Sequence, residues 1–427
     1  MIKIGAVFNF MSLDITRNSA KLLMANVLAQ AIGLVVYPIL TRMYSPADFG
    51  LFNLFVSIGS ILILISLAEY EYAIVLPASH KRAVGVFHVG IITSLVSFVV
   101  LFFATSFSTP IAKMFNEPSL ANLLWLMPFY VLVSSIWMLL NYWYTRVKRF
   151  GAISGYQMSQ SIVSAGAKVG LGCAKAPFGL VYPTVIAPIV SLIISVLSVP
   201  KYIFAPLFKF DRTEIASAAC EFSNFPRYSL PKSLINSISA NLPVLLLVPF
   251  FGAYQVGFFG MAFTLAFKPI STVSASLYQV FFQRTSEQVN CGERIMPFFR
   301  KFVFCSLSLL VPLFVVLAIV LPSFTGWLLG EEWSVTGLYI RLLLPWLALN
   351  FITESVSYIV DVFQCQRANL IFEIMYLLIR LSALLLGVCM GNFMLGIALY
   401  GIGNFLLKLV FLFWLFKLVK VYDQSIK

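Results

Sequence analysis

Uninterrupted apolar runs of about twenty residues recur along this chain from one end to the other. A helix of that length crosses roughly 30 Å of hydrocarbon. Only α-helices and closed β-barrels satisfy every backbone hydrogen bond in lipid, and barrel strands would show shorter, alternating segments. Because 60% of the 427 residues are hydrophobic and only 11% are charged, the sequence predicts an all-α polytopic membrane protein.

Twelve such runs can be separated, and we predict that each is one membrane-spanning helix. Residues 1–17 lack the apolar segment and small-residue cleavage site of a signal peptide, so the first run is expected to be a span. The predicted spans are residues 20–42, 51–76, 83–105, 121–145, 151–173, 177–198, 229–250, 256–282, 302–322, 336–363, 367–389 and 392–417.

Lys and Arg are distributed unequally between the two sides of these spans. With both termini placed in the cytoplasm, 21 of the 29 basic residues lie on the cytoplasmic side, three on the opposite side and five within spans. Cytoplasmic loops carry such an excess, so the asymmetry supports both the span count and the orientation. Attraction to anionic lipid head groups explains the net charge of +13, and no nucleic-acid partner is expected.

Two short stretches repeat one pattern half a chain apart. Tyr44–Phe52 reads YSPADFGLF and Phe251–Phe259 reads FGAYQVGFF, so each has an aromatic residue, Gly six positions later and Phe two beyond that. Each lies at the first interhelical loop of a six-span half, on the same side of the membrane, and is expected to be a structural turn without chemistry, in which glycine relaxes the backbone. The halves therefore form a parallel repeat. The predicted domains are a six-helix lobe at 1–200, a cytoplasmic connecting segment at 201–228 and a second six-helix lobe at 229–427.

Five basic residues lie within the predicted spans, where charge is costly and marks functional sites. Lys268 and Arg380 lie near mid-membrane, so we predict that they line a hydrated cavity, with a buried structural ion pair as the alternative. Lys168 and Arg341 lie near outer ends, from which a long side chain reaches water, and Lys408 is intermediate. The proline after Lys268 is expected to kink the eighth span.

Other charged residues stand at less exceptional depths. Lys21 and Lys232 lie at the entries to spans one and seven, where they either stand at a cavity mouth or anchor the helices as ordinary positive-inside residues. Glu354, nearer mid-span, is expected to pair with Arg380 or to carry a coupling proton. The candidates for ion coupling or pairing are Glu354, Asp361 and Glu373.

Catalytic and cofactor motifs are missing from the sequence. There is no G-x-x-x-x-G-K-[ST], H-E-x-x-H or G-x-S-x-G, and the six cysteines are scattered without metal-ligand spacing. The loops are too short for a soluble catalytic domain. We therefore expect a transporter that is not an enzyme, with no metal or cofactor. An ion gradient of H⁺ or Na⁺, the substrate gradient or a later step that consumes product would drive it.

Several stretches together resemble one family. They are, in the first half, LTRMYSPADFG (Leu40–Gly50) and EYEYAIVLP (Glu69–Pro77), and in the second half EFSNFPRYSLPKSLIN (Glu221–Asn236), NLPVLLLVPFFG (Asn241–Gly252), VGFF (Val256–Phe259) and YQVFFQRTSE (Tyr278–Glu287). In order and spacing these resemble bacterial polysaccharide-biosynthesis membrane proteins of the O-antigen flippase type. Their superfamily, the multidrug/oligosaccharidyl-lipid/polysaccharide (MOP) exporters, includes multidrug-and-toxin extruders and the lipid II flippase.

The resemblance implies a V-shaped alternating-access transporter of the bacterial inner membrane, with two lobes facing a central cationic cavity. The implied substrate is an undecaprenyl-pyrophosphate-linked oligosaccharide, flipped from the cytoplasmic to the outer leaflet. Other polysaccharide-assembly membrane proteins are expected partners. Buried cations would favour the pyrophosphate, although no family motif marks them. The candidate substrate-binding residues are Lys268, Arg380, Lys21, Lys232, Lys168 and Arg341.

Three alternatives remain at this point. A multidrug extruder of the same superfamily would be expected to carry a cavity acid in its first lobe, whereas the first-half acids Glu69 and Glu71 lie near an inner end. A membrane glycan polymerase or ligase would be expected to show a large external loop, whereas the largest loop here is cytoplasmic. The third is a scaffold within a glycan-assembly complex.

Overall fold

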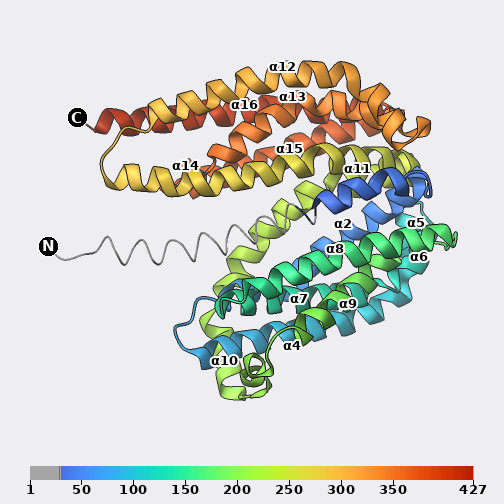
Figure 1. Cartoon of the computed structure of the whole chain (residues 1–427), viewed down its shortest axis with the longest axis vertical. Helices are drawn as coiled ribbons and strands as arrows, with labels where there is room; N and C mark the ends of the chain where they lie inside the picture. Colours follow the sequence, from blue (N-terminus) through green and yellow to red (C-terminus); the bar gives the residue numbers. More distant parts are fainter. Residues whose placement is uncertain (1–27, 29, 427) are drawn as a thin grey trace. The chain divides into compact units, whose positions relative to one another are not determined.

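The structure, a computed structural model, describes residues 28 and 30–426, which form helices and turns without a strand (Figure 1). The described chain divides into two compact units. One contains the residues up to Tyr44 together with Leu54–Ser237, and the other contains Ser45–Asn53 and the residues from Ile238 onward. The short segment Ser45–Asn53 therefore packs with residues from the other half of the sequence.

The helices of the first unit follow the predicted spans in order. They are Gln30–Leu40, α3 (Tyr70–Ala73), α4 (His80–Ala104), η1 (Thr105–Phe107), α5 (Ser108–Met114), α6 (Ser119–Leu124), α7 (Met127–Arg146), α8 (Phe150–Cys173), α9 (Tyr182–Leu197), η2 (Lys201–Ile203), η3 (Ala205–Phe208), α10 (Arg212–Glu221) and the π-helix η4 (Phe225–Ser229). Within this unit α4 packs on α7 and α10, while α8 and α7 pack on α9.

The second unit is built mainly from four long helices. Its elements are α12 (Met296–Leu329), η5 (Glu331–Trp333), α13 (Ser334–Val356), α14 (Tyr358–Val362), α15 (Gln366–Cys389) and α16 (Phe393–Ser425). α13 packs on both α12 and α16, and α15 packs on α16. Two further helices contribute residues to both units: α2 (Pro46–Leu67) and α11 (Leu230–Asn290).

Each of the twelve predicted spans overlaps a described helix, although residues 20–27 and 29 of span one lie outside the described residues, and spans seven and eight both lie in α11. Seven described helices are long and apolar enough to cross a membrane by length and composition, and two shorter apolar helices are Gln30–Leu40 and Tyr182–Leu197. The seven are Pro46–Leu67, His80–Met114, Phe225–Val289, Met296–Leu329, Glu331–Val362, Gln366–Cys389 and Phe393–Ser425. The all-α polytopic fold class is confirmed.

The first repeated stretch differs from its prediction, because the expected turn at Pro46 is the first turn of α2. The Ser45 backbone N–H donates to the Asp48 carboxylate at 2.9 Å, and the Asp48 N–H donates to Ser45 Oγ at 3.3 Å. This is a capping box with proline at the first helical position. α2 then ends at Leu67, before the predicted end at residue 76, since Ala68 and Glu69 adopt positive φ angles of 49° and 61°.

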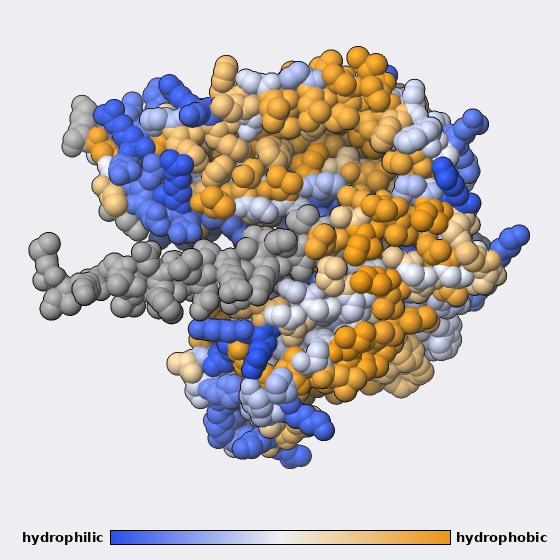
Figure 2. Space-filling model, viewed as in Figure 1, coloured by the Kyte–Doolittle hydropathy of each residue, from blue (hydrophilic) through white to orange (hydrophobic). Residues whose placement is uncertain are grey.

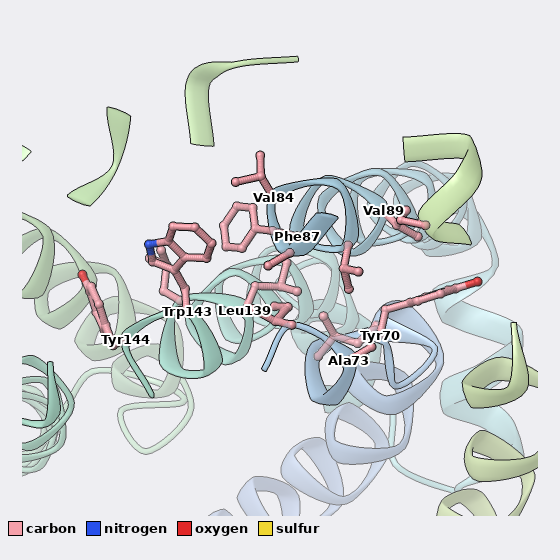
Figure 3. Close-up of a cluster of buried hydrophobic side chains, with 14 of the residues drawn as sticks. Tyr70, Ala73, Val84, Phe87, Val89, Leu139, Trp143 and Tyr144 are labelled. Atoms are coloured by element: carbon pink, nitrogen blue, oxygen red, sulfur yellow. The ribbon is translucent and has the colours of Figure 1, made fainter. Parts of the chain in front are cut away.

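A hydrophobic core holds one end of the first unit together (Figure 3). Val84 and Phe87 on α4 meet Leu139 and Trp143 on α7, and each pair is spaced so that both side chains lie on one helix face. The Trp143 indole is fully buried and donates to the carbonyl oxygen of Ile203 at 3.2 Å. The core therefore anchors the start of the connecting segment to α7.

Ion pairs tie the rest of this connecting segment to α4. Lys81 bridges to Asp211 at 3.0 Å, and Arg82 bridges to Glu214 at 3.1 Å and to Glu221 at 3.0 Å. The pKa of Asp211 is held well below its ordinary value, first by the hydroxyl of Thr213 and then by the Lys81 ammonium. Exposed pairs contribute little singly, but this network keeps α10 against the start of α4.

α11 is interrupted at one residue. Gly252 has φ 80° and ψ 162°, a conformation almost restricted to glycine, and it is the residue of α11 with non-helical dihedrals. The break lies between predicted spans seven and eight, as expected. The kink predicted at Pro269 is not accompanied by non-helical dihedrals, although this proline lies inside the helix.

The two repeated stretches contact each other within the second unit. A Cβ atom added at Gly50 would overlap the carbonyl oxygen of Ala253, and one added at Gly257 would overlap the carbonyl oxygen of Pro46. In the repeat, Pro46 corresponds to Ala253 and Gly50 to Gly257. The contact is therefore reciprocal, and both glycines are required by close approach of two backbones rather than by a special φ angle.

Apolar side chains cover the outer surface of α12 in the second unit. Phe304, Ile319 and Trp327 are 73, 74 and 74% exposed. Figure 2 shows apolar residues over the body of this helix, and hydrophilic residues gather at the end where the C-terminus lies; in the first unit they gather over α10. An apolar surface of this extent is stable against lipid rather than water, which supports a multi-pass membrane protein.

Candidate functional site

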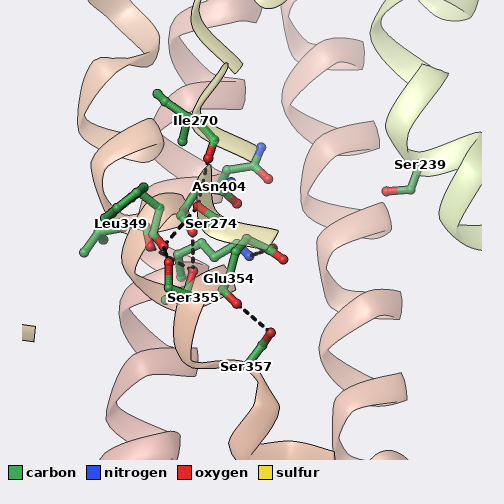
Figure 4. Close-up of polar contacts among 12 residues, drawn as sticks. Ser239, Ile270, Ser274, Leu349, Glu354, Ser355, Ser357 and Asn404 are labelled. Carbon is green, nitrogen blue, oxygen red and sulfur yellow. Dashed lines mark hydrogen bonds and ion pairs between the residues drawn. The ribbon is translucent and has the colours of Figure 1, made fainter. Parts of the chain in front are cut away.

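Arg380 lies at the centre of a polar cluster inside the second unit. Its Nε donates to Asn404 Oδ1 at 2.8 Å, and its Nη1 donates to Ser239 Oγ at 2.9 Å. Both partners are buried, and Ser239, Glu354 and Asn404 come from three different helices (Figure 4). The guanidinium thus links α15 to α11 and α16.

An ion pair between a buried lysine and a half-exposed glutamate lies in the same cluster. Lys408 Nζ contacts Glu354 Oε1 at 2.7 Å, and the side chains of Lys408 and Glu354 are 7% and 49% exposed. The sequence predicted that Glu354 would pair with Arg380 or carry a coupling proton. Its ion-pair partner is Lys408 instead, because α16, rather than α15, packs directly against α13.

The spacing of residues along α15 and α16 explains how the cluster forms. Tyr400, Asn404 and Lys408 recur every four residues, so they line one face of α16. Tyr376 precedes Arg380 by one turn on α15. The Tyr376 ring lies 5.4 Å from the Arg380 guanidinium carbon and 5.1 Å from Lys408 Nζ, within the range of cation–π attraction.

The cluster carries more positive than negative charge. It contains two cations, Arg380 and Lys408, and one ion-paired carboxylate, Glu354, whose partner is Lys408. No described carboxylate forms an ion pair with Arg380. Two of the five guanidinium N–H donors are used by Asn404 and Ser239, and the planar fork suits a bidentate anion such as phosphate. Because the Arg380 side chain is half-buried and has N–H donors left over, it can bind an anionic ligand.

The other predicted cations are not joined to this cluster by hydrogen bonds or ion pairs among the described residues. Lys268 is exposed on α11, and its backbone carbonyl accepts from the hydroxyls of Ser271 and Thr272. Lys232 and Arg341 are exposed near the starts of α11 and α13. Lys21 lies outside the described residues.

Of the remaining candidates, Lys168 lies in the first unit, and Asp361 and Glu373 lie in the second. Lys168 lies on α8 in the first unit and lines a cavity there, while its carbonyl accepts from the hydroxyl of Tyr44 at 2.7 Å. Asp361 is exposed on α14 and accepts from the Tyr278 hydroxyl at 2.6 Å. Glu373 is half-buried on α15. Of the three acidic candidates, Glu354 is the one that forms an ion pair with Lys408.

Sequence reasoning based on charge missed the uncharged polar residues. Asn404 and Ser239 bind the Arg380 guanidinium, but a single amide or hydroxyl in a span does not by itself predict a binding site. On α8 the signal was readable, since Gln157, Gln160 and Ser164 recur at helical spacing within predicted span five. These three residues line the same cavity as Lys168.

The fold of this chain is similar to those of several solved membrane proteins. The lipid II flippase MurJ in its inward closed conformation is similar with a TM-score of 0.71 and 11% identity, over 96% of this chain and 90% of that one. An inward-facing multidrug resistance MATE family transporter of the MOP superfamily gives 0.64 and 14%, over 94% and 99%. A mutant of the Vibrio cholerae MATE transporter VcmN gives 0.59 and 15%, over 96% and 97%.

At these identities the likeness concerns the fold. The similar structures are transporters and a flippase rather than enzymes, in agreement with the expectation that this chain is not an enzyme. A comparison with curated protein sequences gives no match. The polysaccharide biosynthesis protein family matches residues 39–337, a range that contains all six stretches on which the resemblance rests. The chain therefore belongs to the polysaccharide biosynthesis protein family, and its fold is similar to that of the MATE family transporter and of MurJ.

Proposed function

We propose that this protein flips an undecaprenyl-pyrophosphate-linked oligosaccharide, an O-antigen or other surface-polysaccharide repeat unit, across the bacterial inner membrane. Family membership supports the link to polysaccharide biosynthesis, and the fold it shares with a lipid II flippase supports movement of a lipid-linked substrate. The lipid tail stays in the bilayer while the charged head group and glycan pass through a hydrated cavity. Both termini lie in the cytoplasm.

The observation that carries the proposal is the excess positive charge around Arg380. A pyrophosphate brings negative charge into a site of low dielectric, where an unpaired anion is costly. Arg380 offers N–H donors beyond those used by Asn404 and Ser239, and Lys408 adds a second cation only partly neutralised by the half-exposed Glu354. We propose that Arg380 contacts the pyrophosphate directly.

Lys268 is proposed to act at another stage of the same path. Its side chain is exposed on α11 and has no ion-pair partner among the described residues. An uncompensated ammonium in a span is stable when it faces water or an anion. Lys21, Lys232, Lys168 and Arg341 remain candidates for further contacts along the path.

The coupling ion is proposed to be H⁺ or Na⁺, with Glu354, Asp361 and Glu373 as candidate sites. Protonation of Glu354 would release Lys408, and protonation of Asp361 would weaken its contact with Tyr278. Ion uptake would thereby change the charge available to the substrate. A substrate gradient or a later step that consumes product is the other source of drive.

A reconstituted flipping assay tests the proposal. Purified protein in liposomes is given a fluorescent undecaprenyl-pyrophosphate-linked oligosaccharide, and its movement between leaflets is followed under an imposed proton or sodium gradient. We expect wild type to flip the lipid, and Lys268→Ala and Arg380→Ala each to lower the rate at least tenfold, because loss of a charge-assisted contact costs about 1.5–3 kcal/mol.

Arg300→Gln is the matched control, since this exposed arginine on α12 lies outside the cluster and forms no hydrogen bond or ion pair with it among the described residues. Equal rates in all variants would leave the function standing but remove the proposed head-group contacts. No lipid movement by wild type under either gradient would overturn the flippase proposal and favour drug efflux or a scaffold role.

A further inference from the structure

A polar cavity of about 330 Å³ lies in the first unit between the helix Gln30–Leu40 and α8. Its size falls within the range of roughly 300–1,000 Å³ typical of ligand pockets. The polar residues that line it are Gln30, Gln157, Gln160, Ser161, Ser164 and Lys168. None of the described lining residues is acidic, so the cavity is poorly suited to a metal ion or an organic cation.

The polar side chains come mainly from one face of α8. Gln157, Gln160, Ser161, Ser164 and Lys168 are spaced by three or four residues, as required for one helical stripe. α8 crosses the region of predicted span five, where exposure of polar groups to lipid is unfavourable. A stripe of uncharged amides and hydroxyls therefore indicates a hydrated or ligand-filled cavity rather than a lipid contact.

Gln157 supplies the observation that points to a ligand. Its side-chain oxygen is buried and has no hydrogen-bond partner among the described residues. A buried acceptor without a hydrogen bond destabilises the folded protein by about 1–3 kcal/mol, and buried polar atoms in native proteins almost always have a hydrogen-bond partner. A donor that enters the cavity would satisfy this oxygen.

Opposite α8, Gly33 leaves the cavity open. It lines the cavity, and a Cβ atom added there would meet nothing within 4 Å. Tyr37 on the same helix also lines the cavity, giving it one aromatic wall. Amides that both donate and accept, hydroxyls and an aromatic ring together match a ligand rich in hydroxyl groups on a ring.

We propose that this cavity binds a sugar ring of the transported glycan, so that the first unit recognises the oligosaccharide. The assignment rests on the proposed flippase function and extends it by naming where the glycan binds. A sugar hydroxyl donates to Gln157 Oε1, and the neighbouring Gln160 and Ser164 bind further hydroxyls. The proposed pyrophosphate contact, Arg380, lies in the second unit, so Gln157 and Arg380 recognise different parts of the substrate.

Binding measurements with two lipids in nanodiscs test this assignment. One is the undecaprenyl-pyrophosphate-linked oligosaccharide isolated from cells that carry this protein, and the other is undecaprenyl pyrophosphate without sugar. We expect Gln157→Leu to raise the Kd of the glycan-bearing lipid about tenfold, the effect of one lost buried hydrogen bond. The Kd of the sugarless lipid should not change.

Gly33→Leu provides a second test that does not depend on Gln157, because it fills the cavity from the opposite wall. It should also raise the Kd of the glycan-bearing lipid without changing that of the sugarless lipid. Ser159→Ala is the matched control on α8, since that hydroxyl bonds to the Tyr156 carbonyl of its own helix and does not line the cavity. Each variant is first checked for a wild-type thermal transition.

The outcomes separate this assignment from the proposed function. If both variants bind the glycan-bearing lipid more weakly and the sugarless lipid as well as wild type does, the cavity is supported as a sugar site, even if wild type fails to flip lipid in the transport assay. Equal weakening of both lipids, or no change in either, overturns the sugar site while leaving transport to be judged on its own.

Discussion

At the scale of single residues, uncharged partners decide what a buried charge can do. Arg380 is held by an amide and a hydroxyl rather than by a carboxylate, so its charge is oriented without being neutralised. Lys408 is instead matched to Glu354 at 2.7 Å. The first arrangement suits ligand binding, whereas the second holds α13 against α16.

Glu71 is a buried carboxyl that gives the stability of the protein a pH dependence. Its side chain is fully buried just beyond the end of α2, and neither oxygen has a hydrogen-bond partner among the described residues. Burial raises the pKa of Glu71 from 4.5 to about 7. Between these values the unfolded chain releases a proton that the folded chain retains, so stability falls as the pH rises through this window.

We therefore expect Glu71→Gln, which is neutral at every pH, to remove that loss. The pH-dependent loss of unfolding free energy in wild type relative to the variant should be absent below pH 4.5 and complete above about pH 7. It should be at most about 3 kcal/mol. Thermal transitions in detergent at pH 5 and pH 8 measure it. A wild type and a variant that lose the same amount of stability between the two pH values would contradict a buried, protonated Glu71.

At the scale of elements, the contact between the repeated stretches sets how closely α2 and α11 approach. Gly50 faces the backbone of Ala253, and Gly257 faces the backbone of Pro46. Since the atoms in the way are main-chain oxygens, they cannot move aside as a flexible side chain would. The two helices must therefore separate if either glycine gains a side chain.

We expect Gly50→Ala and Gly257→Ala each to lower the melting temperature and the flipping rate, because overpacking against a fixed backbone costs about 1–3 kcal/mol. Gly170→Ala is the control, since a Cβ atom there would meet nothing within 4 Å. Thermal unfolding and the liposome assay give the two readouts. If the glycine variants behaved like the control, the contact would carry no structural constraint.

At the scale of the whole molecule, the proposed orientation can be tested with the native cysteines. Cys173 and Cys389 end α8 and α15 on the predicted outer side, whereas Cys220 and Cys291 lie in predicted cytoplasmic connections, and all four are exposed. In variants that retain one of these cysteines, a membrane-impermeant maleimide applied to spheroplasts should label only the first two. The opposite pattern would reverse the topology.

Much of the architecture could be read from apolar runs, because lipid demands helices of nearly fixed length. The helix ends were less accurate, as at α2, where a capping box and two positive φ angles decided the boundaries. The site was harder to predict. Depth along a span made Arg380 a candidate, but residues 54 positions apart form the Lys408–Glu354 pair, and no one-dimensional pattern reveals which helices become neighbours.

The reciprocal glycine contact also has the form of a symmetric interface. Position 50 meets position 253 while position 257 meets position 46, which is the pairing rule of an isologous interface in a twofold-symmetric dimer. Each glycine is therefore constrained by the main chain of the opposite stretch, and a side chain gained at either position would disturb both members of the repeat.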